Sequence, residues 1–296
     1  MKIIILPRFF LSVALVLIAL ATTGCNSKQT NHIPNKLTIG LVSYGEGKVS
    51  LEKYERFKNY IGLKTQSIVE LEPAYNELQA IAQIQRQRWD IVFATPGLAA
   101  IAIGKELYIP LFSMEGAGSR QHSLLIVRDD KPLQKISDLA NKTIALGETG
   151  SAAGYYVPLY DLYGLTLARI RQAPTPEMVL EWVDKNIVDA GAISDQDFEI
   201  YRRNFTTKFR ILHTSRWIPP GVVLLAPTIE RNQQQQIQKA MNDAPADIAA
   251  DAGYVPTAKI PNYQEFIKIV EKVRPLEARV KQRPATLLLE GSPQQK

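Results

Sequence analysis

Cysteine is nearly absent from this chain, because Cys25 is the only one among 296 residues. A disulfide needs two cysteines, so no bridge can form within the chain. Histidine is almost as scarce, with three residues that lie far apart in the sequence. The chain also lacks the ligand spacings of zinc sites, the G-x-S-x-G and Walker motifs, and a convincing catalytic triad. We therefore expect no metal, no cofactor and no enzymatic activity.

Charge of one sign does not dominate the chain. It carries 35 basic and 29 acidic residues, with a net charge of +6. The basic residues are spread along the sequence and do not form the stripe typical of nucleic-acid-binding proteins, so we expect no nucleic-acid partner. Apolar residues make up 46% of the chain. That content is typical of a globular protein, and the length allows two domains.

The N-terminus has the composition of an export signal. Lys2 and Arg8 give it a positive start, the apolar run 9–21 follows, and residues 22–24 are small. The run is shorter than the about 20 apolar residues that span a bilayer. Cys25 comes next, and the whole segment resembles the signal of bacterial lipoproteins, in which the cysteine after the cut receives lipid. One difference is a threonine at the third position before the cysteine, where those signals prefer leucine.

Two interpretations of Cys25 remain. In the first, residues 1–24 are a lipoprotein signal peptide, Cys25 carries the lipid, and the polar residues 25–36 form a lipidated tether. In the second, Cys25 is a small buried thiol, or an ordinary signal is cut elsewhere. We favour the first because the lone cysteine lies at the position where lipoproteins need it. It predicts a protein anchored by lipid to a bacterial membrane, facing the periplasm or the cell exterior.

Short apolar segments alternate with amphipathic ones along the rest of the chain. Strands are expected at 37–42, 67–71, 90–94, 108–112, 123–127, 143–146, 167–171, 190–193, 209–212 and 222–225. Helices are expected at 51–61, 74–86, 96–104, within 131–140, at 152–163 and 176–185, from 195, and at about 229–250 and 263–281. Apolar strands separated by helices predict an α/β fold with mostly parallel sheets covered on both faces. We expect two lobes, residues 37–121 with 225–296, and residues 122–224.

The stretch 146–158, LGETGSAAGYYVP, is the strongest sign of a binding site. A strand runs into closely spaced glycines, and a helix starts after them. Such a turn leaves backbone N–H groups unpaired, and together with the helix dipole it can hold an anion such as phosphate. Thr149 and Ser151 add hydroxyl groups. The alternative is a turn that only joins a strand to a helix.

Other candidates follow from the rule that open α/β sheets bind ligands at the carboxyl ends of their strands. Ser43 and Tyr44 follow the first strand, and Thr95 follows the third. Ser194 and Asp195 follow the strand that ends at residue 193. For Asp195 we favour the alternative that it is the N-cap of the next helix over contact with a ligand.

Six segments carry a family resemblance. They are Trp89 to Val92, His122 to Arg128, Ile136 to Leu139, Lys142 to Ala145, Gly150 to Pro158, and Val188 to Ala192. Together they resemble the phosphate/phosphite/phosphonate substrate-binding proteins of ABC transporters, the PhnD-like family, over about residues 37–275. The resemblance implies a periplasmic-binding-protein type II fold, in which strands crossing near 121–124 and 221–225 join two lobes around a ligand cleft.

In that family, hydroxyl groups and backbone amides at the start of the helix hold an oxyanion. Gly150 and Ser151 match the family motif, whereas Ala152 and Ala153 stand where the family usually has Thr and Ser. The amides of both alanines can still donate. The family's cleft tyrosine is also missing after Gly97. These residues are therefore ligand-binding candidates in an altered form of the motif.

The resemblance implies a solute-binding protein that captures a small anion, such as phosphate, phosphite or a phosphonate, and serves an ABC transporter permease. A same-fold module for a different small ligand, serving a membrane sensor, is the alternative. The two alanines of the motif favour this alternative. An enzyme built on the same fold is a third hypothesis, and its support would be a nucleophile and a base in contact within the cleft.

Overall fold

The computed structural model describes residues 35–42, 51–115 and 121–289. All of them belong to one compact unit that begins at Asn35. The predicted signal, Cys25 and the site candidates Ser43 and Tyr44 lie outside the described residues. None of the described helices combines the length and the apolar composition that crossing a bilayer requires.

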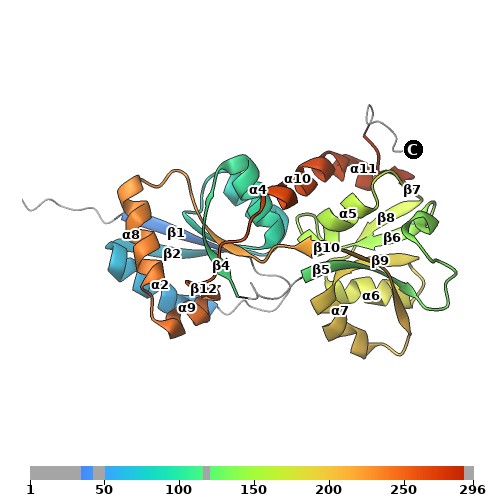
Figure 1. Ribbon diagram of the computed structural model, residues 1–296, viewed down its shortest axis with the longest axis horizontal. Coiled ribbons are helices and arrows are strands. Elements are labelled where there is room, and N and C mark those ends of the chain that lie inside the picture. Colours follow the sequence, from blue (N-terminus) through green and yellow to red (C-terminus); the bar gives the residue numbers. More distant parts are fainter. Residues whose placement is uncertain (1–34, 43–50, 116–120, 290–296) are drawn as a thin grey trace, which may run out of the picture. The chain divides into compact units, whose positions relative to one another are not determined.

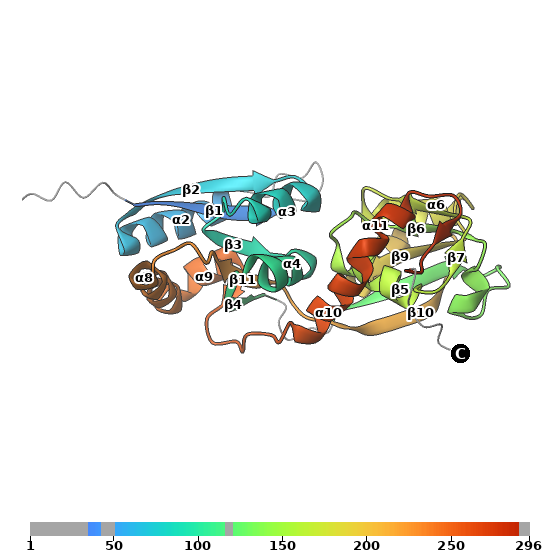
Figure 2. The ribbon, with the colours of Figure 1, turned by 90° about the horizontal axis from the view of Figure 1, so that it is seen from above.

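The first sheet contains six strands in the order β12-β4-β11-β3-β1-β2. The strands are β1 (Asn35–Val42), β2 (Ser67–Ala74), β3 (Ile91–Ala94), β4 (Ile109–Met114), β11 (Val222–Leu225) and β12 (Tyr254–Val255). Around it lie α2 (Leu51–Thr65), α3 (Glu77–Gln85), α4 (Pro96–Glu106), α8 (Arg231–Asn242) and α9 (Ala246–Ala252), as Figures 1 and 2 show. We call this part lobe 1.

The second sheet contains five strands in the order β10-β5-β9-β6-β8. The strands are β5 (Gln121–Arg128), β6 (Thr143–Leu146), β8 (Arg169–Gln172), β9 (Ala190–Ser194) and β10 (Phe209–Ile218). Its helical elements are η1 (Ile136–Leu139), the π-helix η2 (Ala152–Tyr156), α5 (Val157–Asp161), α6 (Pro176–Asp184), α7 (Asp195–Tyr201) and η3 (Arg202–Asn204). We call this part lobe 2.

The predicted α/β architecture with two sheets flanked by helices is confirmed, but each sheet is mixed. In lobe 1, β1 is parallel to β2 and β3, whereas β11 runs antiparallel between β3 and β4. In lobe 2, β6 is parallel to β8 and β9, whereas β5 is antiparallel to β9 and β10. A parallel neighbour needs a long crossover, usually a helix. β11 follows β10 of the other lobe after three residues, so it enters its sheet without such a helix.

The C-terminal part of the described chain joins the lobes. Helix α10 (Gln264–Val273) contacts α4 of lobe 1 and α5 of lobe 2, and Figures 1 and 2 show it between the two lobes. Strand β13 (Ala285–Thr286) then pairs with β7 (Thr166–Leu167) beside the second sheet. The sequence assigned residues 225–296 to lobe 1. The structure instead places the end of that segment against lobe 2, where Ala285 and Thr286 pair with Leu167 and Thr166.

Two other expected elements are interrupted in the structure. The expected helix at 229–250 is two helices, α8 and α9, separated just before Ala246. Pro245 explains the break, because proline has no N–H and disfavours the helical conformation of the residue before it. The expected helix at 263–281 likewise contains the 3-10 turn η4 (Arg274–Leu276) between α10 and α11 (Glu277–Val280).

Aromatic packing fixes β3, the strand that leads to the candidate site. Phe93 of β3 makes edge-on contacts with Tyr54 and Phe57 of α2, with ring centroids 5.2 and 5.4 Å apart. Phe57 also contacts Tyr254, at 5.7 Å. Such pairs contribute about 0.5 to 1.5 kcal/mol each beyond the burial of their area. They hold the carboxyl end of β3, and therefore Thr95, in a defined position.

Candidate ligand-binding site

A cavity of about 410 Å³ lies between lobe 1 and lobe 2. Lobe 1 contributes Glu77, Thr95 and Pro96, and Gln121 lies at the start of lobe 2. The remaining wall consists of Gly147, Glu148, Ser151, Ala152, Ala153, Gly154, Ala173, Pro174, Thr175, Pro176, Val179, Ala192, Ile193, Ser194, Asp197 and Tyr201. Because a water molecule occupies about 30 Å³ in the liquid, the cavity has room for a ligand of on the order of ten non-hydrogen atoms.

Four helices with a serine or threonine N-cap begin at the wall of this cavity, each just after a strand. Their N-cap residues are Thr95, Ser151, Thr175 and Ser194. The last three accept a hydrogen bond from a backbone N–H in the first turn of their own helix, as N-caps do. Thr95 makes no such bond. The preference of Ser and Thr for N-caps therefore brings four hydroxyl groups to one cavity.

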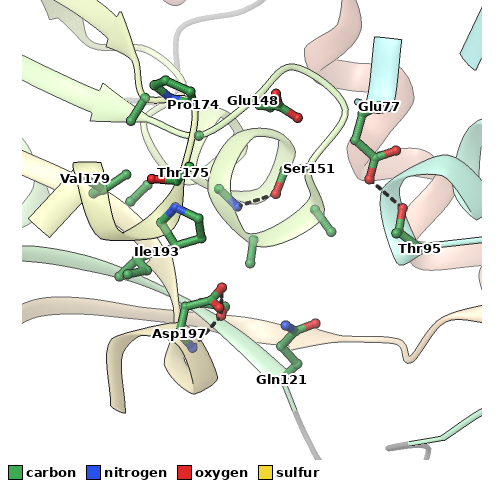
Figure 3. A pocket seen from close by; sticks show the side chains of 18 of the residues that line it. Glu77, Thr95, Gln121, Glu148, Ser151, Pro174, Thr175, Val179, Ile193 and Asp197 are labelled. Carbon is green, nitrogen blue, oxygen red and sulfur yellow. Dashed lines mark hydrogen bonds between the residues drawn. The ribbon is translucent and has the colours of Figure 1, made fainter. Parts of the chain in front are cut away.

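The four hydroxyl groups differ in whether their protons already have an acceptor among the described residues. Thr95 donates to Oε1 of Glu77 at 2.6 Å, and Ser194 donates to Oδ2 of Asp197 at 2.6 Å. Ser151 and Thr175 have no acceptor for their hydroxyl protons among the described residues. Figure 3 shows Ser151 in the middle of the cavity wall, with the Glu77–Thr95 pair on one side and Thr175 on the other. Ser151 and Thr175 can thus donate to a ligand without breaking an existing bond.

The glycine-rich turn presents backbone donors beside Ser151. Gly150 has φ of 107°, a conformation that favours glycine. The helix that follows opens with the π-turn η2, a feature often found at functional sites. Ala152 and Ala153 are its first residues, so the helix supplies no acceptor for their amides. Behind them, Ser123 donates to the carbonyl oxygen of Ala153 at 2.6 Å and holds the turn against β5.

The two lobes touch at this turn. A β-carbon on Gly97 of α4 would lie 1.9 Å from the carbonyl oxygen of Gly150, so backbone meets backbone there. The carboxylate of Glu148 accepts a hydrogen bond from the backbone N–H of Glu77. Glu77 is the first residue of α3, so the carboxylate of Glu148 lies at the N-terminus of that helix. A carboxylate at this position also interacts favourably with the helix dipole. The cavity is therefore closed on this side by direct contacts between lobes.

Three carboxyl groups, those of Glu77, Glu148 and Asp197, line the cavity, and no Lys, Arg or His is among its described lining residues. Burial raises the pKa of Glu148, partly offset by the bond from the Glu77 amide. Burial also raises the pKa of Asp197, and the hydroxyl of Ser194 partly offsets it. The described wall thus offers neutral donors, and its carboxyl groups would oppose a fully ionised ligand.

The structure brings most of the described sequence candidates to this wall. Thr95, Ser151, Ala152, Ala153 and Ser194 line the cavity. The other candidates lie elsewhere: Thr149 lines a neighbouring cavity, Gly150 packs against Glu77, and Asp195 lies 3.4 Å from Nδ1 of His122. Asp195 is the first residue of α7, and the N-cap is Ser194.

Sequence reasoning missed the three carboxyl groups and Thr175. Glu148 lies inside the motif 146–158, but its role depends on Glu77, which comes from the other lobe. Thr175 follows β8 and precedes a proline at the first helical position, which is a usable N-cap signal. Asp197 stands three residues after Ser194, which is the spacing of a capping box and a second usable signal, and its carboxyl group accepts the proton of the Ser194 hydroxyl.

Two α/β lobes that enclose a cavity edged by helix N-termini define a type II periplasmic binding protein. Three solved structures share this fold. XAC2383 from Xanthomonas citri, solved with ATP, has a TM-score of 0.67 at 22% identity, covering 81% of this chain and 98% of its own. PhnD1 from Prochlorococcus marinus, solved with methylphosphonate, has a TM-score of 0.62 at 14% identity, covering 81% and 98%. A binding protein component of an ABC phosphonate transporter from Pseudomonas aeruginosa has a TM-score of 0.59 at 16% identity, covering 83% and 88%.

A match between the sequence and a family model shows to which family the chain belongs. The model of the ABC transporter phosphonate periplasmic substrate-binding proteins matches residues 39–269. The chain belongs to this family, as its motifs predicted. No curated protein matches the chain significantly.

Proposed function

We propose that this protein is a lipid-anchored solute-binding protein that captures a phosphonate or a related phosphorus oxyanion between its lobes and delivers it to an ABC transporter permease. One observation carries the proposal. The hydroxyl of Ser151 and the amides of Ala152 and Ala153 form a group of neutral donors at the start of a helix, inside the cavity. Donors of this kind, with the helix dipole, suit an oxyanion.

The size and charge of the cavity narrow the ligand. Its volume of about 410 Å³ exceeds what inorganic phosphate or methylphosphonate fills. The carboxyl groups of Glu148 and Asp197 disfavour a second full negative charge nearby. The site therefore suits a ligand that bears one protonated oxygen or a substituent with a positive charge or hydrogen-bond donors. Two proteins of the same fold were solved with phosphorus-containing ligands, methylphosphonate and ATP, and this supports the chemical class.

The predicted lipid on Cys25 gives the binding protein its location. A lipid and a polar tether keep the protein near a membrane partner and raise its local concentration there. Ligand binding between the lobes favours the closed form, whose surface differs from that of the open form. The permease would respond to that closed surface.

A second candidate function is a same-fold receptor for a different small ligand that serves a membrane sensor. Ala152 and Ala153 favour it, because the family usually has hydroxyl side chains there. Hydrogen bonds to a charged partner contribute about 1.5 to 3 kcal/mol each, so two missing hydroxyls can change the ligand. The carboxyl groups in the wall favour it as well, since a cationic ligand would use them.

Calorimetry with phosphate, phosphite, methylphosphonate and aminoalkylphosphonates tests the proposal. We expect saturable binding of at least one phosphonate. The double variant Ala152→Thr with Ala153→Ser should bind it more tightly, because it restores two hydroxyl donors. If none of these compounds gives a heat of binding at millimolar concentration, the proposal is contradicted. Binding of cationic or neutral ligands alone would favour the second candidate.

A further inference from the structure

A second cavity, of about 260 Å³, adjoins the interlobe cavity. Asn76 and Leu78 of lobe 1 line it, together with five residues of lobe 2, which are Glu148, Thr149, Gln172, Ala173 and Pro174. Glu148, Ala173 and Pro174 also line the main cavity. Figure 3 shows Glu148 and Pro174 together at one rim of the main cavity. The two cavities are therefore separated by three shared residues.

The polar groups of the second cavity are held in place. Gln172 donates from Nε2 to the hydroxyl of Thr149 at 2.6 Å. The hydroxyl of Thr149 is also hydrogen-bonded to the side chain of Tyr155, which is only 1% exposed. Thr149 thus has both a donor and an acceptor within the protein, and it fixes the amide of Gln172. The carbonyl oxygen of that amide takes no part in this network.

The other sides of the second cavity offer an apolar surface and an acceptor. Leu78 is 58% exposed and contributes an apolar side chain to the lining. Oε2 of Glu148 is buried without a hydrogen-bond partner among the described residues. A buried acceptor without a partner costs free energy that a donor on a ligand would recover. Together these features fit a chain that leaves the main cavity past Glu148 and ends at Gln172.

We propose that the second cavity is a subsite for the substituent of an extended phosphonate, whose phosphorus group occupies the main cavity. This inference rests on the proposed function and adds the class of ligand. Glu148 is the only ionisable residue of the described lining. The substituent is therefore uncharged or positively charged and bears hydrogen-bond donors, and a terminal carboxylate is rejected. Binding of such a ligand also joins the lobes, because Leu78 belongs to one and Gln172 to the other.

The test compares three kinds of probe by calorimetry on the purified full chain. The first is methylphosphonate, which reports on the main cavity alone. The second is a series of alkylphosphonates with a terminal primary amide and spacers of increasing length. The third is the matched series with a terminal carboxylate. We expect the best amide ligand to bind at least about fivefold more tightly than methylphosphonate, and more tightly than its carboxylate counterpart.

Variants then test which residues account for the tighter binding of the amide ligand. Gln172→Leu and Leu78→Ser should each lower the ratio of amide-ligand affinity to methylphosphonate affinity about fivefold. Gln121→Leu, which changes only the main cavity, should leave that ratio unchanged. Circular dichroism checks that each variant is folded, and the ratio in the unmodified chain is informative by itself. If methylphosphonate binds but spacer length and terminal charge make no difference, the subsite is refuted and the proposed function stands. If no phosphonate binds, both are refuted.

Discussion

Gly97 of lobe 1 and Gly150 of lobe 2 meet backbone to backbone, so closely that a β-carbon on Gly97 would lie 1.9 Å from the carbonyl oxygen of Gly150. This contact lies beside the amide of Ala152, which is 3.2 Å from the same β-carbon position. The residues that bring the lobes together therefore lie next to the residues that present donors to the cavity. This geometry places the contact between the lobes at the edge of the candidate site.

The first prediction concerns this contact. Gly97→Ala should weaken methylphosphonate binding at least about tenfold, or about 1.4 kcal/mol, because the lobes can no longer close fully. The melting temperature should change little, since alanine suits a helix. Gly104→Ala in the same helix is the control, because its β-carbon meets only a side chain, that of Ile267. Equal binding by the two variants would show that the Gly97 contact does not govern closure.

The second prediction separates the roles of two N-cap serines. Ser151→Ala and Ser194→Ala should each lower the free energy of unfolding by about 1 kcal/mol, because both lose a cap. Only Ser151→Ala should strongly weaken phosphonate binding. The reason is that the proton of Ser194 is already donated to Asp197. Chemical denaturation and calorimetry measure the two effects, and a matching loss of binding in both variants would remove the special role of Ser151.

The third prediction concerns pH. Burial raises the pKa of Asp197, so its contribution to stability is fully present below its unfolded pKa, about 3.9, and is lost as pH rises through the folded value. Asp197→Asn should therefore gain stability relative to the unmodified chain as pH rises. Denaturation curves at several pH values between about 3 and 8 measure this difference.

Asp130 provides the control for that series. Its pKa is lowered by a hydrogen bond from Arg128, so its contribution is present above the unfolded pKa and is lost as pH falls. Asp130→Asn should therefore lose stability relative to the unmodified chain as pH rises. The same pH trend in both variants would contradict the assignment of opposite shifts to the two carboxyl groups.

The fourth prediction concerns Cys25. In a bacterial host, the unmodified chain should fractionate with membranes and incorporate labelled fatty acid. Cys25→Ala should lose the label and leave the membrane fraction, because the chain has no second cysteine to acylate. Recovery of the variant in the membrane fraction at the level of the unmodified chain would point to another form of attachment.

The sequence predicts local features of the site well and long-range ones poorly. The turn around Ser151 was predictable because glycine spacing, a preceding strand and a following helix all lie within one short segment. The place of Glu77 in the site was not predictable, because the expected strand at 67–71 ends too early. The real strand β2 continues to Ala74, so Glu77 is the first residue of α3, just past the carboxyl end of that strand, and does not lie within a helix that starts at residue 74.

The fold shows the same division. Alternating apolar segments predicted the two α/β sheets, because burial patterns are local. The direction of β11 and the pairing of β13 with β7 depend on which segments meet after the chain crosses between lobes. No periodicity in the sequence encodes such a meeting. The contact of Glu148 with Glu77 belongs to the same class, since 71 positions separate two residues that neither segment identifies alone.

The central claim is that an oxyanion binds at the start of the helix that follows Ser151. A crystal structure of the protein with a bound phosphonate tests it most directly. The account predicts phosphonate oxygens within about 2.6 to 3.2 Å of the hydroxyl of Ser151 and of the amides of Ala152 and Ala153. A phosphorus group held elsewhere in the cavity, or a ligand that meets this turn with a carbon chain or a cation, would contradict it.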